Sequence, residues 1–210
     1  MHFCGRGWNG ERITDLRNMN DLLIGTAGFF LYFIYDVNSV EWNNRLLQKL
    51  FGAGSLCVVL STIDFVRVSF VRQQAWGLFR IGFAVFGLLF LGLLIYTLFF
   101  ALPFEQTYLE ESRMRKAYTE GIYSLCRHPG VLWFAGLYLC LWGMTGSLSG
   151  GVFFVLMIVW NIIYIIFQDL WTFPRTFTNY NEYKRGTPFL IPDGKSVRAC
   201  LLSIRGLKRD

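Results

Sequence analysis

Charged residues are scarce in this chain of 210 residues: Asp, Glu, Lys and Arg make up 16% of it, against about a quarter of an average soluble domain. Hydrophobic residues make up 54% and aromatic residues 18%. This composition excludes an ordinary soluble domain and is typical of a membrane protein. The length allows a bundle of roughly five transmembrane helices and leaves no room for a separate soluble domain.

Cysteine and histidine are also few. The five cysteines are Cys4, Cys57, Cys126, Cys140 and Cys200, an odd number with no C-x-x-C pair. This pattern favours reduced thiols over a disulfide framework or a zinc site, and we expect no bound metal. Of the two histidines, only His128 lies in a polar cluster. The first apolar segment follows about twenty polar residues without a small-residue cleavage site, so we expect no removable signal peptide.

Internal repeats are absent from the sequence, and the apolar segments hold almost no ionisable residue except Asp64. Both absences argue against a transporter built from repeats.

Five apolar segments predict helices, at residues 22–35, 46–65, 81–103, 131–144 and 152–167. The first is short and marginal as a span. The third has no charged residue and exceeds the roughly 20 residues that cross a hydrocarbon core of about 30 Å. A turn rich in Gly and Ser joins the last two, which predicts an antiparallel helical hairpin. We therefore expect an all-α, polytopic membrane bundle with a C-terminal hairpin and a cytoplasmic tail.

The distribution of basic residues predicts the orientation in the membrane. The formal net charge is +6. In so apolar a chain, basic residues that flank the spans explain this charge better than nucleic acid, so the predicted partner is the lipid bilayer, and no nucleic-acid partner is expected. With five spans and an inside C-terminus, the cytoplasmic segments hold 14 of the 20 Lys and Arg residues. If residues 22–35 only lie in the interface, the N-terminus moves inside and the later topology is unchanged. No oligomeric state is predicted.

The triplet Arg127-His128-Pro129 precedes the fourth apolar segment. Proline is favoured at the first helical position, because its missing N–H would be unpaired there. The next helix is therefore predicted to begin at Pro129, with free backbone N–H groups and a guanidinium at one place. Such a place suits a carboxylate or phosphate. The alternative is an arginine that reaches lipid headgroups beside a capping histidine.

A second polar cluster begins where the last apolar segment ends. Asp169 lies at this boundary, where a buried carboxylate needs a partner or a role. Tyr180 and Tyr183 are three residues apart and share one face of a helix. Their alternative role is an interfacial aromatic belt. If the hairpin closes, both polar clusters meet on one membrane face.

The run Thr119-Glu-Gly-x-Tyr123-x-x-x-Arg127-His-Pro129, followed by Tyr180-Asn-Glu-Tyr-Lys184, Pro188 and Pro192, resembles the isoprenylcysteine carboxyl methyltransferase family and its phospholipid methyltransferase relatives. The resemblance covers about residues 113–192. It divides the chain into N-terminal transmembrane helices (1–103), a methyltransferase-like core (104–192) and a basic tail (193–210).

The resemblance implies an integral membrane enzyme that binds S-adenosylmethionine at its cytoplasmic face and methylates a lipophilic acceptor arriving from the membrane. The residues that it implies for the cofactor are Lys116, Tyr118, Tyr123, His128, Pro129, Gly130, Val131, Tyr180 and Glu182. For catalysis it implies Arg127, His128 and Asp169, and for the substrate Tyr164 and Gln168. A carboxylate acceptor needs no base, whereas an amine would need His128 or Asp169 to take its proton.

The chain departs from the family pattern at several positions, and the loss of the first acid at Gln168 leaves the acceptor open. Val131 stands where these families usually have Tyr, and Gln168-Asp169 replaces an acidic pair. One alternative is a sterol-reductase-like enzyme with a nicotinamide cofactor, which shares the Arg-His-Pro turn. The other is a non-catalytic membrane protein that retains the fold. The tail after Pro192 predicts either a short interfacial helix or a solvated segment.

Overall fold

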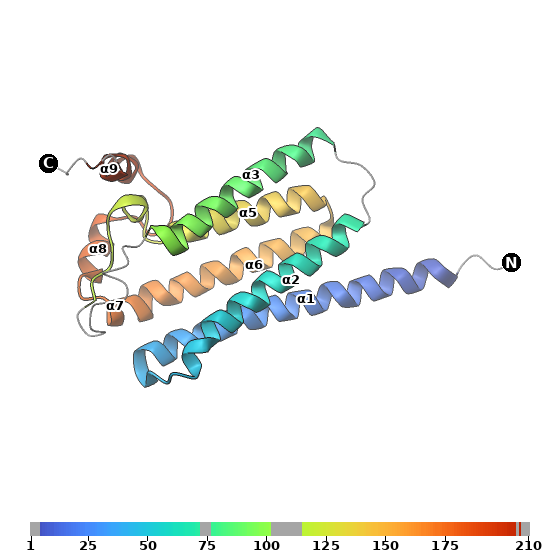
Figure 1. Ribbon diagram of the computed structural model, residues 1–210, viewed down its shortest axis with the longest axis horizontal. Coiled ribbons are helices and arrows are strands. Elements are labelled where there is room, and N and C mark those ends of the chain that lie inside the picture. The colour runs from blue at the N-terminus through green and yellow to red at the C-terminus, as the bar shows by residue number, and fades with distance from the viewer. Residues whose placement is uncertain (1–4, 72–76, 102–114, 205, 207–210) are drawn as a thin grey trace. The chain divides into compact units, whose positions relative to one another are not determined.

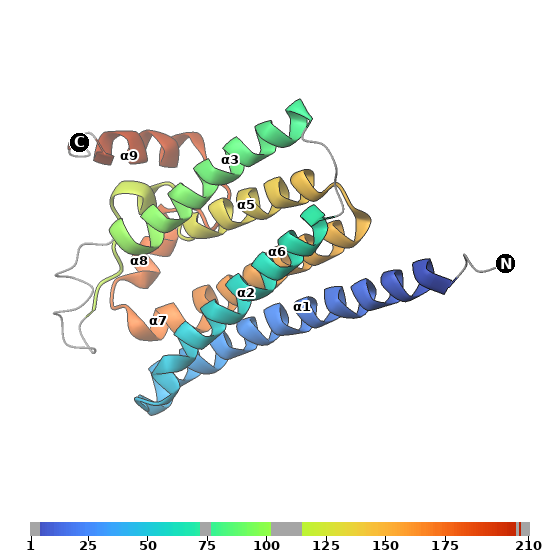
Figure 2. The same cartoon turned by 45° about the vertical axis from the view of Figure 1, so that its right-hand side comes forward.

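The computed structural model describes residues 5–71, 77–101, 115–204 and 206. All regular structure within these ranges is helical, as Figure 1 and Figure 2 show. The α-helices are α1 (Gly5–Val37), α2 (Leu50–Val71), α3 (Leu78–Ile95), α5 (Pro129–Thr145), α6 (Leu148–Phe167), α7 (Phe173–Thr176), α8 (Tyr180–Gly186) and α9 (Gly194–Ile204). Three π-helical segments are η1 (Asn38–Trp42), η3 (Tyr96–Phe100) and η5 (Gln168–Thr172), and two 3-10 turns are η2 (Leu47–Lys49) and η4 (Gly121–Ser124). The predicted all-α class is confirmed.

Four helical stretches are long and apolar enough to cross a membrane, which makes this an integral membrane protein. They are Leu16–Trp42, Leu47–Ser69, Leu78–Phe100 and Leu148–Thr176, with 27, 23, 23 and 29 residues. The shorter apolar helix α5 has 17 residues. The predicted hairpin turn is reduced to Gly146 and Ser147 between α5 and α6, and Gly146 has a positive φ of 59°.

The first span is longer than the 14 apolar residues from which it was predicted. The helix continues through polar residues because neighbouring side chains accommodate them: Arg17 pairs with Asp64 of α2 at 3.3 Å. No proline lies within α1 to stop it.

The chain divides into two compact units, each discontinuous in sequence: Met1–Ala84 with Tyr138–Tyr164, and Val85–Leu137 with Ile165–Asp210. In the first unit, α1 and α2 lie side by side in both views (Figure 1; Figure 2). A Cβ atom on Gly28 would lie 2.8 Å from the carbonyl oxygen of Gly54, and one on Gly54 would lie 2.7 Å from that of Gly28. Glycine at both positions therefore allows the two backbones to approach closely.

Aromatic side chains fill the rest of the first unit's interior. Phe65 of α2 stacks on Phe153 of α6 with ring centroids 4.4 Å apart, and both rings are buried. Tyr138 of α5 packs edge-to-face on Phe154, and a hydrogen bond of 2.6 Å joins its hydroxyl to that of Thr62. These contacts tie α2 to both arms of the hairpin.

The second unit holds the turn before α5 and the helices after α6. The ring of Phe90 in α3 stacks on Trp133 of α5, and a Cβ atom on Gly136 would lie 2.7 Å from that ring. Residues Gly194–Ile204 of the tail form helix α9, which packs on η4, while the predicted place of this helix at the membrane interface stays a prediction. The described part of this unit brings η4, the start of α5, η5 and α8 together.

Candidate functional site

Asp169 lies in the π-helical segment η5 of the second unit and is 4% exposed. Its Oδ1 accepts hydrogen bonds from Arg127 Nε at 2.8 Å, from the Tyr180 hydroxyl at 2.6 Å and from His128 Nε2 at 3.3 Å. Its Oδ2 is 3.2 Å from Arg127 Nη2 and 3.0 Å from Lys184 Nζ. We call Asp169, Arg127, His128, Tyr180 and Lys184 the Asp169 cluster. The two oxygens of a carboxylate offer about four lone-pair directions, and five donors occupy them here.

Arg127 connects the turn before α5 with the end of α8 and with the residues that follow α8. Its Nη1 donates to the carbonyl oxygens of Lys184 at 3.1 Å and Thr187 at 2.9 Å, and its backbone N–H donates to Pro188 O at 2.9 Å. The guanidinium carbon lies 5.5 Å from the ring centroid of Phe189. With the bidentate pair to Asp169, these contacts occupy a guanidinium whose side chain is only 9% exposed.

His128 is held between aromatic rings. Its imidazole stacks on Phe173 with centroids 5.7 Å apart and meets Phe189 edge-to-face at 5.2 Å. Burial lowers the pKa of His128 below its ordinary value, so the ring is neutral at pH 7. Because Asp169 accepts at Nε2, the neutral ring carries its proton there and Nδ1 holds the lone pair.

A chain of hydrogen bonds extends from α8 to α3. The Tyr183 hydroxyl donates to Tyr123 O at 2.6 Å, and the Tyr123 hydroxyl donates to Thr97 O in η3 at 3.0 Å. Trp133 Nε1 completes the chain on the Thr97 hydroxyl at 3.1 Å. Burial raises the pKa of Tyr123 to about 12 and raises that of Tyr183 as well, so both phenols stay protonated donors.

The connector before η4 is held by the side chain of Asn179, which mimics a backbone peptide group. Its Oδ1 accepts from Ala117 N at 2.7 Å, and its Nδ2 donates to Ala117 O at 3.0 Å. Thr178 N donates to Arg115 O at 3.0 Å beside it. The buried Nε of Arg115 has no hydrogen-bond partner among the described residues. The guanidinium of Arg115 is thus a cation with spare donor capacity close to Lys116.

The predicted site residues fall into three groups. Arg127, His128, Asp169 and Tyr180 form one cluster, so the predicted meeting of the two polar clusters is confirmed. The prediction that α5 begins at Pro129 is also confirmed, and Val131 N bonds His128 O at 3.1 Å just inside it. Tyr180 and Tyr183 are both buried on one side of α8, as their spacing predicted.

The remaining predicted residues lie around this cluster or apart from it. Lys116 and Glu182 are exposed, Tyr118, Gly130 and Gln168 are half-buried, and Tyr118 meets Tyr123 edge-to-face at 6.1 Å. Tyr164 belongs to the first unit, where it stacks on Tyr32 at 5.3 Å. Much of the predicted connector, residues 102–114, lies outside the described residues.

Sequence reasoning missed several members of the site. Lys184 is four residues after Tyr180, so helical spacing places both on one face and could have revealed it. Thr97 and Asn179 carry no such signal, because each acts through a contact with a residue distant in the sequence.

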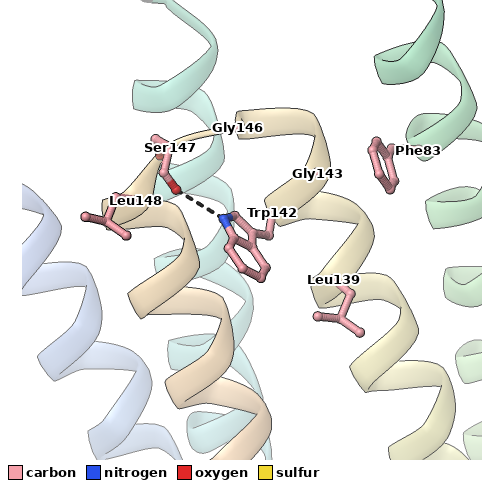
Figure 3. Close-up of a pocket in the computed structure, with 7 residues that line it drawn as sticks. All are labelled: Phe83, Leu139, Trp142, Gly143, Gly146, Ser147 and Leu148. Carbon is pink, nitrogen blue, oxygen red and sulfur yellow. Dashed lines mark hydrogen bonds between the residues drawn. The ribbon is translucent and has the colours of Figure 1, made fainter.

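A pocket of about 510 Å³ lies at the turn of the hairpin, in the first unit (Figure 3). It is lined by Phe83, Leu139, Trp142, Gly143, Gly146, Ser147 and Leu148. Trp142 Nε1 donates to Ser147 O at 3.1 Å across the turn. The lining has no titratable side chain, so this pocket offers no acid–base chemistry. Within the described ranges, no three His, Cys, Asp or Glu side chains are grouped as metal ligands.

Comparison of the chain with protein-family models, curated proteins and solved structures finds no match.

Proposed function

We propose that this protein is an integral membrane methyltransferase that uses S-adenosylmethionine and acts on a lipophilic acceptor, isoprenylcysteine-carboxylate-like or phospholipid-like. The observation that supports this proposal is the Asp169 cluster. Arg127 and His128 come from the Arg-His-Pro run, whereas Tyr180 and Lys184 come from the tail motif, and one carboxylate binds all four. The two motifs on which the family resemblance rests are therefore joined by the hydrogen bonds of one carboxylate.

The residues of the connector fit the proposed cofactor. Its carboxylate needs a cation with unused donors, and Arg115 supplies a buried Nε without a partner among the described residues, with Lys116 exposed next to it. Its adenine ring needs aromatic faces or edges, which Tyr118 and Tyr123 offer. We assign the cofactor to Arg115, Lys116, Tyr118 and the start of α5.

S-adenosylmethionine, when bound, would supply an already activated methyl group. The protein then has to orient the acceptor and exclude water. In this geometry Arg127 and Asp169 are positioning residues. The Arg127 guanidinium is occupied by Asp169 and two backbone carbonyl oxygens. The Asp169 carboxylate is occupied by side-chain donors of the cluster. His128 is neutral and presents a lone pair at Nδ1, so it is the group able to take a proton from an amine acceptor.

A non-catalytic membrane protein with the same fold is the second candidate. The saturation of the Asp169 carboxylate favours it, because such a cluster stabilises a fold without any ligand. Under that alternative, substitutions at Arg115 and Lys116 alter no ligand binding.

The test is binding of radiolabelled S-adenosylmethionine to the purified full-length protein in detergent. We expect saturable binding that NADPH does not displace. Arg115→Gln should weaken it about tenfold, the effect of one lost charge-assisted hydrogen bond. Arg45→Ala is the matched control, because it removes an exposed cation in the first unit and should leave the affinity unchanged.

Each outcome separates the candidates. Binding of NADPH in place of S-adenosylmethionine would favour the reductase alternative. Binding of neither, by protein whose unfolding transition is intact, would overturn the methyltransferase proposal and leave the non-catalytic one.

A further inference from the structure

Helix α9 has one buried face, which packs on η4, and another face whose side chains are exposed. The docked face holds the buried residues Ser196, Ala199 and Cys200 and contacts η4. Gly121 N donates to Ser203 Oγ at 2.8 Å, which ties α9 to the turn that carries Tyr123. The helix is capped at its start, where Ser196 N donates to Asp193 Oδ1 at 2.7 Å.

The outward half of α9 combines an apolar stripe with two cations. Val197, Leu201 and Ile204 follow one another at helical spacing and are 40%, 54% and 66% exposed. Arg198 is exposed beside this stripe, and Lys195 is exposed further around the helix. No acidic residue occurs within Gly194–Ile204 to offset them. Large apolar side chains in water are unfavourable, so this half of the helix requires a partner.

The orientation of α9 suits a membrane surface. Within the second unit, Figure 1 shows α9 end-on, whereas the unit's parts of α3 and α5 are seen along their length. Figure 2 brings the length of α9 into view at the end of the unit where α5 begins. A helix that lies crosswise to the spans, at their ends, runs in the plane of the headgroups.

We propose that the outward half of α9 binds an anionic phospholipid surface. Val197, Leu201 and Ile204 would enter the boundary of the acyl chains, and Lys195 and Arg198 would pair with anionic headgroups. Charge complementarity selects this partner: each basic side chain near an anionic leaflet favours binding by about fivefold. This inference is independent of the proposed methyltransferase activity.

The proposed contact also reaches the site. Ser203 of α9 accepts a hydrogen bond from Gly121 of η4. Lipid that restricts the movement of α9 therefore also restricts the turn that carries Tyr123. Membrane charge would therefore stabilise the start of α5.

The experiment places a fluorescent dansyl amino acid at position 201 of the full-length protein in lipid nanodiscs. The discs contain either phosphatidylcholine alone or phosphatidylcholine with phosphatidylglycerol, and both lipids carry brominated acyl chains, which quench the dye on contact. The matched control carries the dye at Asn181, an exposed polar position on α8 in the same unit. A second probe at Ile204 covers the case in which the first disturbs the helix.

We expect quenching at positions 201 and 204 to be at least threefold stronger in the anionic discs and to weaken at high salt. Quenching at position 181 should be the same in both discs. Lys195→Glu with Arg198→Glu, two exposed changes, should remove the lipid dependence. Equal quenching in both discs, or a lipid dependence that survives the charge reversal, would overturn the proposal. So would a blue-shifted but unquenched dye whose emission depends on protein concentration, which is the signature of a second copy on this face.

Discussion

At the scale of single residues, the Asp169 carboxylate determines how the second unit holds together. It is buried and faces the guanidinium of Arg127 and the ammonium of Lys184. A buried ion pair adds little over an apolar pair of the same shape, but removing one partner leaves the other charge unpaired. A substitution that removes one partner of the pair should therefore destabilise the protein more than expected from a double substitution that removes both charges.

We predict that Asp169→Asn lowers the free energy of unfolding by about 3 kcal/mol, the low end for a broken buried pair, because Lys184 stays partly in water. Glu182→Gln, at an exposed position, should change it by less than about 0.5 kcal/mol. Denaturation in detergent by a graded denaturant measures both. The double variant Arg127→Gln with Asp169→Asn keeps polar groups at both positions and leaves neither charge of the pair without the other, so it should be less unstable than the sum of its single changes. A loss equal to that sum would contradict this account.

The lowered pKa of His128 predicts that the stability of the protein depends on pH. Its folded-state pKa lies below the ordinary value of 6.5, so the unfolded chain takes up a proton first as the pH falls. The contribution to stability is complete above pH 6.5 and is lost as the pH falls toward the folded pKa, with a slope of at most about 1.4 kcal/mol per pH unit. The unfolding temperature should therefore fall between pH 7.5 and 5.5, and less so in His128→Gln, which keeps a donor toward Asp169. Parallel curves for the two proteins would show that another group titrates.

The sequence predicted the parts of this cluster better than their arrangement. Pro129, Asp169 and the shared face of Tyr180 and Tyr183 follow from local rules of helix starts and helical spacing. The contacts of Arg127 with the carbonyl oxygens of Lys184 and Thr187 do not, because they depend on where α8 ends. A residue pattern indicates a charge, but only the fold decides which groups neutralise it.

At the scale of elements, three long helices end in π-helical segments, and each segment places a buried polar group at the end of a span. These groups are Asn38 in η1, Thr97 in η3, and Asp169 with Thr172 in η5. The wider turn exposes backbone oxygens to side chains: Thr97 O accepts from Tyr123, and Asp169 O accepts from Lys184 Nζ at 3.3 Å. The predicted end of the last apolar segment at residue 167 matches the end of α6, but no residue pattern predicted the π-helical turn that follows it.

The contact of α1 with α2 gives a prediction with a built-in control. Gly54→Ala places a methyl group against the carbonyl oxygen of Gly28, which forces the helices apart and should cost about 1–3 kcal/mol. Gly52→Ala, two residues earlier on α2, meets nothing within 4 Å and should be neutral or stabilising, since Ala favours a helix. Unfolding in mixed micelles measures both, and equal effects would contradict the close approach of the two backbones.

The contact of α3 with α5 can be tested by compensation. Gly136→Ala brings a methyl group against the Phe90 ring and should destabilise the protein by about 1–3 kcal/mol, whereas Gly92→Ala meets nothing within 4 Å. Phe90→Leu in the Gly136→Ala background should restore part of the loss, because the smaller side chain makes room. Additive losses in the double variant, measured by the same unfolding assay, would mean that the ring and the glycine do not face each other.

At the scale of the whole molecule, the Asp169 cluster constrains how the hairpin crosses the bilayer. Helix α5 has 17 residues, which at about 1.5 Å per residue is shorter than a hydrocarbon core of about 30 Å. Helix α6 belongs to a stretch of 29 residues that is long enough to cross. Arg127 before α5 pairs with Asp169 after α6, so both ends of the hairpin lie on the same side of the membrane. Helix α5 must therefore cross the membrane as well.

The crossing of α5 predicts on which side of the membrane two positions lie. Eight of the 20 Lys and Arg residues follow residue 168, which favours an inside C-terminus, and the hairpin turn then lies outside. Ser147→Cys, in the turn, should react with a membrane-impermeant maleimide added to intact cells. Asn181→Cys, on α8, should react only after the cells are made permeable. Reaction of both positions from the same side would mean that α5 does not cross, and the Arg127–Asp169 pair could then not form in the membrane. Inverted reactivity would instead keep the hairpin and reverse the predicted orientation.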